Sequence, residues 1–283
     1  MTEFQYVKEF LSTAKGTEGS LLIPKKIHAM LIEETEKALI PRSEAMMYLG
    51  PSQITASSLD LNLATPDSLQ VRQLGEYNEI EMDEVDYTNI NIRPAKYGVS
   101  IRITKDLLED AQFNLLQHNI RVAGKRLAEN ENSLIVTQLD TAANTIGGGA
   151  AITIANITRA MQYLEDNDFN PTTFALGMEV ANDIRNIDTF TEVDKSGSND
   201  MLSRGFIGNI YGMKVYKVST NAGMTTTSSY VFDREFAYVI GEKRPLTVEN
   251  FDLPLLDSKG AAITQRITAK AVRTNAIAKI TTS

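Results

Sequence analysis

Few residues of this chain are of the types that do chemistry, and their spacing forms no recognisable catalytic or metal site. The two histidines, His28 and His118, each stand alone on a helical pattern. A zinc protease would place two histidines four residues apart on one helix, and a serine hydrolase would place its nucleophile in a G-x-S-x-G turn. Neither arrangement occurs in the sequence. We therefore expect both histidines to be ordinary helix-face residues, and we predict no catalytic residue, no metal and no cofactor.

Two glycine-rich stretches resemble parts of phosphate-binding sites, but each lacks the residues that would complete one. Gly147–Gly149 is not followed by the Gly-Lys-Ser/Thr of a phosphate loop, and Gly205–Gly208 does not match the dinucleotide fingerprint. We interpret the triple glycine as a hinge-like boundary between two parts of the chain. The chain has no cysteine, which excludes disulfides, iron–sulfur clusters and thiolate zinc sites.

A cluster of carboxylates is the remaining chemical feature. Calcium binding is one interpretation, but the spacing lacks the D-x-[DN]-x-[DN]-G pattern, and alternation along a strand would send the carboxylates to opposite faces. The other interpretation is an acidic edge that faces solvent or a partner, and we expect it to contact another subunit. The cluster has no cation within it and consists of Glu76, Glu79, Glu81, Asp83, Glu84 and Asp86.

The acidic cluster belongs to a longer stretch with an extended pattern. Leu59, Leu61 and Leu63 alternate with polar residues, as do Ile90 and Ile92, which is typical of strands. Between positions 43 and 92 there are nine carboxylates and one basic residue, a balance of −8 that equals the net charge of the whole chain. A lone hairpin with this charge repels itself and has little to pack on, so the pattern indicates that another subunit receives it.

A long helical pattern follows a short predicted strand between Tyr97 and Thr104. Apolar residues recur from Lys105 to about Ala143 without a proline, with Thr104 as the expected N-cap. A continuous helix of this length would measure nearly 60 Å at about 1.5 Å per residue, which indicates an architectural role. The alternative is two helices that break near Gly124, because glycine costs about 1 kcal/mol relative to alanine in a helix.

The rest of the chain alternates between short helices and strands. We predict an arm at 1–23 that is mobile or bound to a partner, and a short helix that begins at Pro24 and ends before Pro41. A later helix should begin after an Asn156 cap and end near Asn167. The other predicted elements are strands at 172–176, 213–218, 229–232, 237–240, 246–248, 263–272 and 276–280, and a helix at 179–186.

Composition excludes several classes of protein. With 42% hydrophobic and 23% charged residues, the chain is an ordinary globular protein. A sequence pI near 5.0 and the acidic excess argue against a dedicated nucleic-acid binder, which needs a basic surface. No apolar run approaches the roughly 18 residues of a membrane span, and the N-terminus has no signal-peptide pattern.

The order of these elements resembles that of a known family. An arm, a short helix, a long extended loop, a very long helix, a mixed α/β part and a late return to strands are similar to the major capsid proteins of tailed phages, which have the Hong Kong 97-type fold. The most family-like stretch runs from Gly205 through Gly208 and Gly212 to Val218. It looks like the glycine-punctuated turn that leads into a strand of the family's axial domain.

The resemblance implies an α+β fold with an N-terminal arm, an extended β-hairpin loop, a long spine helix, and peripheral and axial domains. It assigns residues 1–42 to the arm and short helix, and 43–97 to the extension loop. Residues 98–145 and 244–273 would form the peripheral domain, and 146–243 and 274–283 the axial domain. Gly205, Gly208 and Gly212 would form the axial-domain turn.

The resemblance also implies a function, a set of partners and a location. The chain would self-assemble through hexamers and pentamers into an icosahedral shell around a viral double-stranded DNA genome, in a virion assembled in the host cytoplasm. Separate scaffolding, portal and decoration proteins are the implied partners, packaged DNA is contacted only non-specifically, and no membrane is involved. Some relatives cross-link through a lysine of the extension loop, but no lysine occurs between Lys37 and Lys96. The alternatives are an encapsulin-type cellular shell and an enzyme with an unrecognised site.

Overall fold

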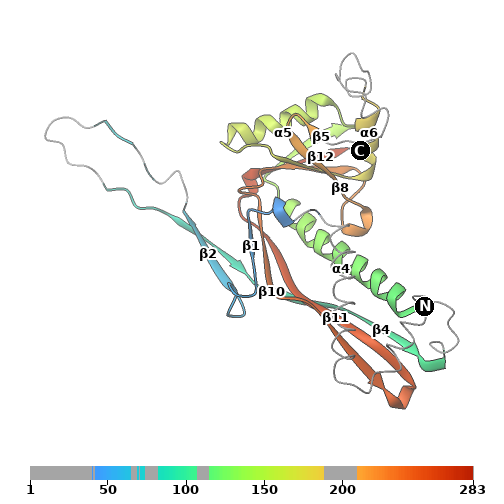
Figure 1. Ribbon diagram of the computed structural model, residues 1–283. Helices are drawn as coiled ribbons and strands as arrows, with labels where there is room; N and C mark the ends of the chain where they lie inside the picture. Colours follow the sequence, from blue (N-terminus) through green and yellow to red (C-terminus); the bar gives the residue numbers. More distant parts are fainter. Residues whose placement is uncertain are drawn as a thin grey trace, which may run out of the picture.

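The computed structural model describes residues 40, 42–64, 69, 71–73, 82–106, 115–187 and 209–282. It contains a four-stranded sheet, a six-stranded sheet and a two-stranded hairpin that projects away from both (Figure 1). The expected arm at 1–23, the short helix before Pro41, His28, Glu76, Glu79, Glu81, Gly205 and Gly208 lie outside the described residues.

The four-stranded sheet has the order β1-β10-β11-β4. Its two longest strands, β10 (Tyr238–Leu253) and β11 (Ser258–Ala271), form an antiparallel pair, and β4 (Ala95–Thr104) lies antiparallel to β11. The short β1 (Met47–Leu49) completes the other edge, parallel to β10. Successive residues of β11 alternate between buried and partly exposed, because one face of the sheet packs on a helix and the other does not.

That helix is α4 (Leu115–Leu139), which is continuous through Gly124. The alternative of a break near Gly124 is therefore wrong. Ala123 and Leu127 pack on Ile263 of β11, which shows that the apolar stripe of the helix covers the sheet. The 25 residues of α4 measure about 37 Å. Residues 107–114 lie outside the described ranges. Whether one helix runs from Lys105 into α4 therefore stays a prediction.

The C-terminal end of α4 differs from the prediction. The helix ends at Leu139 rather than near Ala143, and β5 (Asn144–Gly149) follows almost at once. The backbone N–H of Ala143 donates to the carbonyl of Thr274 at 3.1 Å, so this residue belongs to the start of a sheet. Residues 141–143 favour helix locally, but the distant Thr274 provides the hydrogen bond that the extended chain uses.

The six-stranded sheet has the order β5-β12-β9-β6-β8-β7 and contacts α5 (Ile154–Asp166) and α6 (Met178–Arg185). Its core includes Ile157 and Leu164 of α5 together with Phe174, all fully buried. The other strands are β6 (Thr173–Leu176), β7 (Asn209–Ile210), β8 (Met213–Lys217), β9 (Ser228–Phe232) and β12 (Ile277–Thr282). Single-turn 3-10 helices occur at Arg42–Glu44 (η1), Thr220–Ala222 (η3), Pro254–Leu256 (η4) and Thr274–Ala276 (η5).

Two local predictions in this part are wrong. The triple glycine is part of strand β5 and not a hinge; a Cβ on Gly148 would lie 2.9 Å from Thr282 Cγ2, so glycine lets β5 approach β12 closely. The N-cap of α5 is Thr153 rather than Asn156. Asn156 is the third helical residue, and its side-chain oxygen accepts a hydrogen bond from the backbone N–H of Thr153. This hydrogen bond completes a capping box.

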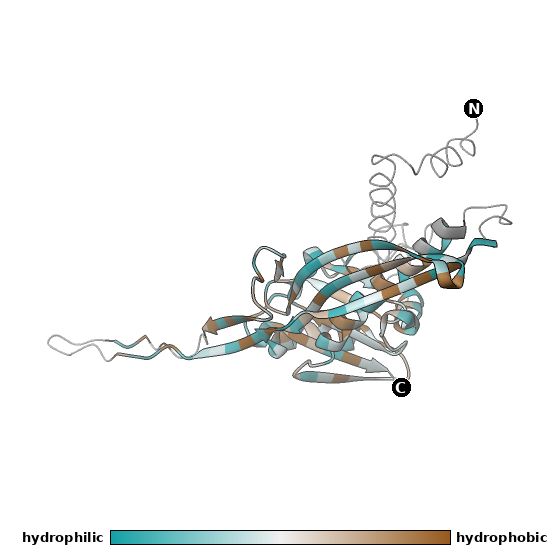
Figure 2. Cartoon of the chain, turned by 90° about the horizontal axis from the view of Figure 1, so that it is seen from below, coloured by the Kyte–Doolittle hydropathy of each residue, from teal (hydrophilic) through white to brown (hydrophobic). Residues whose placement is uncertain are grey.

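The hairpin consists of β2 (Leu59–Ala64) and β3 (Tyr87–Ile92), paired antiparallel from Leu59↔Ile92 to Ala64↔Tyr87. Figure 2 shows it extending from the body in a second view, with mixed hydropathy along its length. The same view shows brown and teal segments along the strands of the body, as expected for strands with one covered face.

The continuity of α4 is testable at Val122, whose side chain is 48% exposed and contributes little packing. Val122→Pro removes one backbone hydrogen bond and clashes with the preceding turn, which should lower the free energy of unfolding by about 3 kcal/mol or more. Val122→Ala is the matched control and should leave stability nearly unchanged. Urea denaturation of the dissociated subunit, monitored by circular dichroism, measures the free energy of unfolding of both variants. Equal stability of the two variants would contradict a continuous helix at this point.

Candidate assembly interface

The root of the hairpin is fixed by close packing against β10. Ile92 and Ile54 are buried there with Val239 in one apolar cluster. A Cβ on Gly241 would lie 2.7 Å from Ile92 Cγ2, so the absence of a side chain on β10 allows the hairpin to sit directly on the sheet. Farther out, the guanidinium of Arg273 donates to the carbonyl of Ala64 at 3.1 Å.

Beyond Ala64 and Tyr87 the described hairpin residues are largely exposed. Val71 and Met82 are almost fully exposed, and Leu69 and Tyr87 are more than half exposed. The described part of the same subunit therefore leaves these four apolar side chains largely uncovered.

Three of the six predicted contact acids lie on this part of the hairpin. Asp83 pairs with Arg72 at 3.0 Å between Nη2 and Oδ1, so that carboxylate has a partner within the hairpin. Glu84 and Asp86 are exposed, whereas Asp83 and Val85 are half-buried. The alternation places Glu84 and Asp86 on one side of an extended chain. Their contact role stays a prediction, and so does that of the acids at 76, 79 and 81.

Of the three predicted turn glycines, the described one is Gly212. It follows Tyr211 in a two-residue turn between β7 and β8, with φ values of 82° and 48° respectively. Positive φ at both positions is what a type I′ hairpin turn requires, and glycine adopts it without strain. The assignment of this turn to an axial domain stays a prediction.

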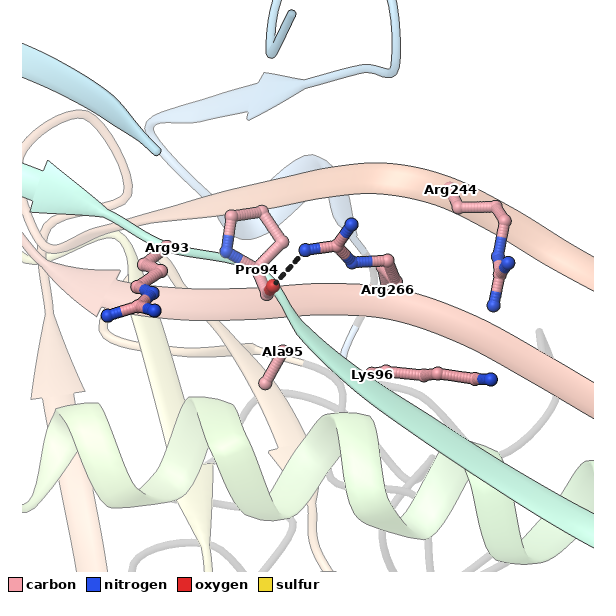
Figure 3. A pocket seen from close by; sticks show the side chains of 6 residues that line it. All are labelled: Arg93, Pro94, Ala95, Lys96, Arg244 and Arg266. Carbon is pink, nitrogen blue, oxygen red and sulfur yellow. Dashed lines mark hydrogen bonds between the residues drawn. The ribbon is translucent and has the colours of Figure 1, made fainter. Parts of the chain in front are cut away.

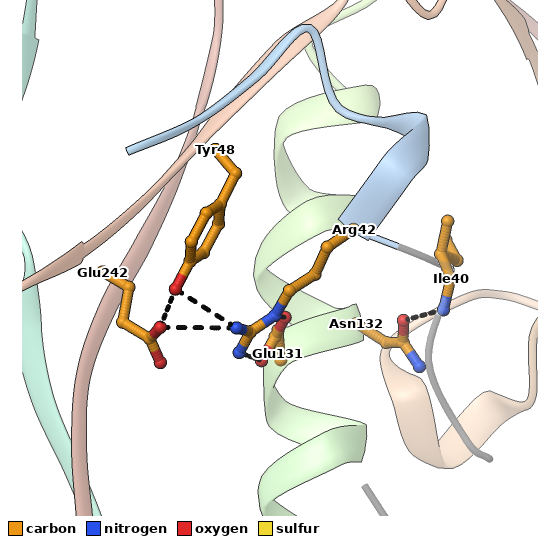
Figure 4. Close-up of polar contacts among 6 residues, drawn as sticks. All are labelled: Ile40, Arg42, Tyr48, Glu131, Asn132 and Glu242. Atoms are coloured by element: carbon orange, nitrogen blue, oxygen red, sulfur yellow. Dashed lines mark hydrogen bonds and ion pairs between the residues drawn. The ribbon is translucent and has the colours of Figure 1, made fainter. Parts of the chain in front are cut away.

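Sequence reasoning did not find the polar network that holds the start of the described chain to the body (Figure 4). Arg42 of η1 makes a two-pronged ion pair with Glu131 of α4, with Nε–Oε1 and Nη2–Oε2 distances of 2.8 and 3.0 Å. Its third nitrogen lies 3.3 Å from Glu242 of β10, to which Tyr48 also donates. These carboxylates raise the pKa of Arg42 although burial lowers it.

Two residues farther along, Glu44 joins the same turn to the six-stranded sheet. Its carboxylate is 1% exposed and accepts hydrogen bonds from Thr173 Oγ1 at 2.7 Å, Tyr216 Oη at 3.0 Å and Lys214 Nζ at 3.2 Å. Burial raises the pKa of Glu44, but these three donors outweigh it and hold the pKa below its ordinary value. Burial and the same carboxylate raise the pKa of Tyr216 to about 12.

A second feature that sequence reasoning missed is a basic pocket of about 490 Å³ on the four-stranded sheet (Figure 3). Its charged lining residues are Arg93, Lys96, Arg244 and Arg266, and no acid among the described residues lines it. Pro94 and Ala95 form the rest of the wall, at the bend between the hairpin strand β3 and the sheet strand β4. The nearest sequence signal was the local pair Arg93 and Lys96, because the other two cations come from strands far along the chain.

Within the residues that the structure describes, no group of three or more His, Asp or Glu side chains is placed to hold a metal ion. In the same residues, no helix has both the length and the apolar character to cross a membrane.

The Glu44 network predicts a pH-dependent stability. Glu44→Gln keeps the side-chain shape but removes the charge, and should lower the free energy of unfolding by about 1–3 kcal/mol near neutral pH. Because the folded pKa lies below the unfolded value of 4.5, this stabilisation is present above pH 4.5 and is lost as pH falls through the folded pKa.

Urea denaturation at several pH values measures the difference between Glu44→Gln and the unaltered subunit, and it should shrink below pH 4.5. The control is Glu235→Gln, at an exposed carboxylate of the same half of the molecule, which should change stability by less than about 0.5 kcal/mol. A Glu44→Gln effect that stays constant down to strongly acidic pH would contradict the role of the charge.

Comparison with known proteins identifies the family. Residues 87–280 match the family model described as phage capsid protein. Comparison with curated protein sequences found no match. Among solved structures, a chain from Mycobacterium phage Che8 is similar with a TM-score of 0.67 and 16% identity, over 80% of this chain and 85% of that one. A chain from the mature capsid of bacteriophage PhiM1 has a TM-score of 0.65 and 11% identity, over 84% and 85% of the two chains.

A virus-like particle from Pyrococcus furiosus is also similar, with a TM-score of 0.61 and 10% identity over 91% of this chain and 99% of that chain. At these identities the likenesses show the fold alone, which is the Hong Kong 97-type α+β fold predicted from the order of elements. The family model favours a phage capsid over the encapsulin-type alternative, because it covers most of the chain from β3 to β12. This chain therefore belongs to the phage capsid protein family, and it is a structural shell protein of the virion.

Proposed function

We propose that copies of this chain assemble through hexamers and pentamers into an icosahedral shell around double-stranded viral DNA, each hairpin lying on a neighbouring subunit. The observation that carries this proposal is the hairpin itself. It extends beyond the core of its own subunit and exposes Val71, Met82 and Tyr87, which its own subunit leaves uncovered. Burial of apolar area on a neighbour contributes roughly 25 cal/mol per Å², so this contact favours assembly.

The domain roles are part of the same proposal. The four-stranded sheet with α4 would be the peripheral domain (98–145 and 244–273), and the six-stranded sheet with α5 and α6 the axial domain (146–243 and 274–283). Support comes from the sheets, since β4 and β11 belong to one and β5 and β12 to the other. Strand β10 begins at Tyr238, so it crosses the boundary proposed at 243/244. Residues 43–97 would be the extension loop and 1–42 the arm.

The remaining partners follow from the role in a shell. Separate scaffolding, portal and decoration proteins would act with this chain, and the packaged DNA would be contacted without sequence preference. The net charge of −8 argues against tight binding of the phosphate backbone, which requires a basic surface. Assembly would take place in the host cytoplasm, and the chain would have no catalytic activity.

Removal of the outer hairpin tests self-assembly. Ala64 and Tyr87 are directly opposite in the pairing register, so an Asn-Gly turn can replace residues 65–86 and join them. The truncated subunit should keep its stability within about 0.5 kcal/mol, because the described residues of the removed segment are largely exposed. Negative-stain microscopy should show uniform closed shells from the full chain and none from the truncated one. Uniform shells from the truncated chain would contradict the proposed role.

The second expectation is a shell without covalent cross-links. The hairpin offers no lysine for an isopeptide bond, since none occurs between Lys37 and Lys96, and the absence of cysteine excludes disulfides. Stability must then come from buried area and from mass action. Particles boiled in detergent should give a single band near 31.3 kDa on a denaturing gel. A ladder of multimers that survives boiling would show that covalent links are present.

A further inference from the structure

The basic pocket is formed by a row of cations on three neighbouring strands. In the register of the sheet, Lys96 of β4 lies opposite Arg266 of β11, and Arg266 lies opposite Arg244 of β10. Arg93 completes the group at the root of the hairpin. Like charges directly opposite one another on a sheet destabilise it, so an anion bound among these cations would stabilise the sheet.

The subunit does not supply that anion from its described residues. Arg266 donates to the carbonyl of Pro94 at 3.3 Å, and Arg244 donates to the hydroxyl of Thr264 at 3.0 Å, both of which are uncharged acceptors. The Nε atom of Arg244 is buried without a hydrogen-bond acceptor. No ion pair joins any of the four cations to a carboxylate in the described part of the chain.

The pocket lies on the face of the sheet opposite α4, next to the hairpin root that packs on Gly241. Along β11 the odd-numbered residues Ile263, Gln265 and Ile267 are buried on the side of α4, and Arg266 therefore points to the opposite side. Figure 3 shows the side chains of Lys96, Arg244 and Arg266 gathered from adjacent strands around one hollow. An extended segment that crosses the strands on this face could contact all three in succession.

We propose that this pocket receives the carboxylates of Glu84 and Asp86 from the hairpin of a second copy of the chain. The inference rests on the proposed function and names the receiving site for the hairpin. Glu84 and Asp86 are exposed on one side of an extended segment, about 6.8 Å apart along the chain. The cations stand on strands about 4.8 Å apart, a difference that their long side chains span.

The carboxylates must come from another copy. In the same chain, strand β3 separates Asp86 from Arg93 at the pocket, and its pairing with β2 keeps it extended. Seven residues of extended chain hold the two about 24 Å apart. Figure 1 and Figure 2 both show the hairpin leaving the body on which the pocket lies. A phosphate of nucleic acid is the other anion that could bind these cations. The hairpin carboxylates are favoured as the occupant, because Arg72 is the one basic residue between positions 43 and 92.

Charge reversal with compensation tests the pairing. Arg244→Glu with Arg266→Glu, and separately Glu84→Lys with Asp86→Lys, should each lower the yield of assembled shells at least about tenfold, because like charges then meet at the contact. Combining all four changes should restore most of the yield. Arg102→Glu, on the same face of β4 but about 20 Å from Lys96, is the matched control and should assemble normally. Sedimentation measures assembly, and circular dichroism confirms that each subunit folds.

A second measurement uses the unaltered shell and needs no variant to fold. Lys96 is the amine of the pocket, so a carbodiimide should link it to Glu84 or Asp86. Mixed shells of isotope-labelled and unlabelled subunits, analysed by mass spectrometry, should contain linked peptides of mixed label. The absence of such peptides between Lys96 and residues 82–86 would overturn the inference.

The remaining outcomes distinguish a failure of the pocket–hairpin pairing from a failure of the proposed function. Normal shell yield from the Arg244→Glu, Arg266→Glu variant would overturn the inference and leave the proposed function intact. If that variant forms shells normally but carries less nucleic acid, the pocket binds phosphate and the inference is also wrong. If the unaltered chain forms no shells under any assembly condition, the proposed function fails, and the inference fails with it.

Discussion

The arrangement of the two sheets depends on one buried carboxylate. A charge removed from water is tolerated only when other groups compensate it, and Glu44 finds its compensation on the six-stranded sheet, from Thr173, Tyr216 and Lys214. The turn that carries Glu44 also carries Arg42, whose partners are on α4 and β10. One short turn therefore makes charged contacts with both halves of the molecule. Loss of the Lys214 ammonium would leave the buried carboxylate of Glu44 without a cation, so these contacts favour one relative position of the two halves.

Apolar packing between the two sheets also holds them in this relative position. Phe232 at the end of β9 and Tyr238 at the start of β10 belong to different sheets, yet their rings meet edge to face with centroids 5.8 Å apart in a shared core. Because β10 also supplies Gly241 under the hairpin root, the same strand that enters this core supports the hairpin. A projecting hairpin can present its contacts at a fixed angle only if its root is rigid, and close packing provides that rigidity.

What could be predicted from sequence, and what could not, follows from the range of the interactions. Strands such as β2 and helix α4 were predicted because their apolar periodicity is a local property. The end of α4 and the triple glycine were misinterpreted, since Thr274 and Thr282, more than a hundred residues away, decide the backbone conformation there. Glu44 and the basic pocket were missed for the same reason: their residues meet only through the pairing of strands that are distant in the sequence, β6 with β8 and β4 with β11.

Charged and apolar residues have different roles in the proposed contact between a hairpin and its neighbouring subunit, which is repeated throughout the shell. Exposed apolar residues such as Val71 and Met82 contribute favourable free energy on burial, but apolar contact alone tolerates sliding between subunits. A row of cations that meets two carboxylates on one side of an extended segment is satisfied in one register, which gives specificity more than affinity. The cations of a free subunit repel one another, and under the proposed pairing this repulsion would end when a neighbour binds. Closure of the shell would then stabilise the sheet, and mass action would favour the assembled state further.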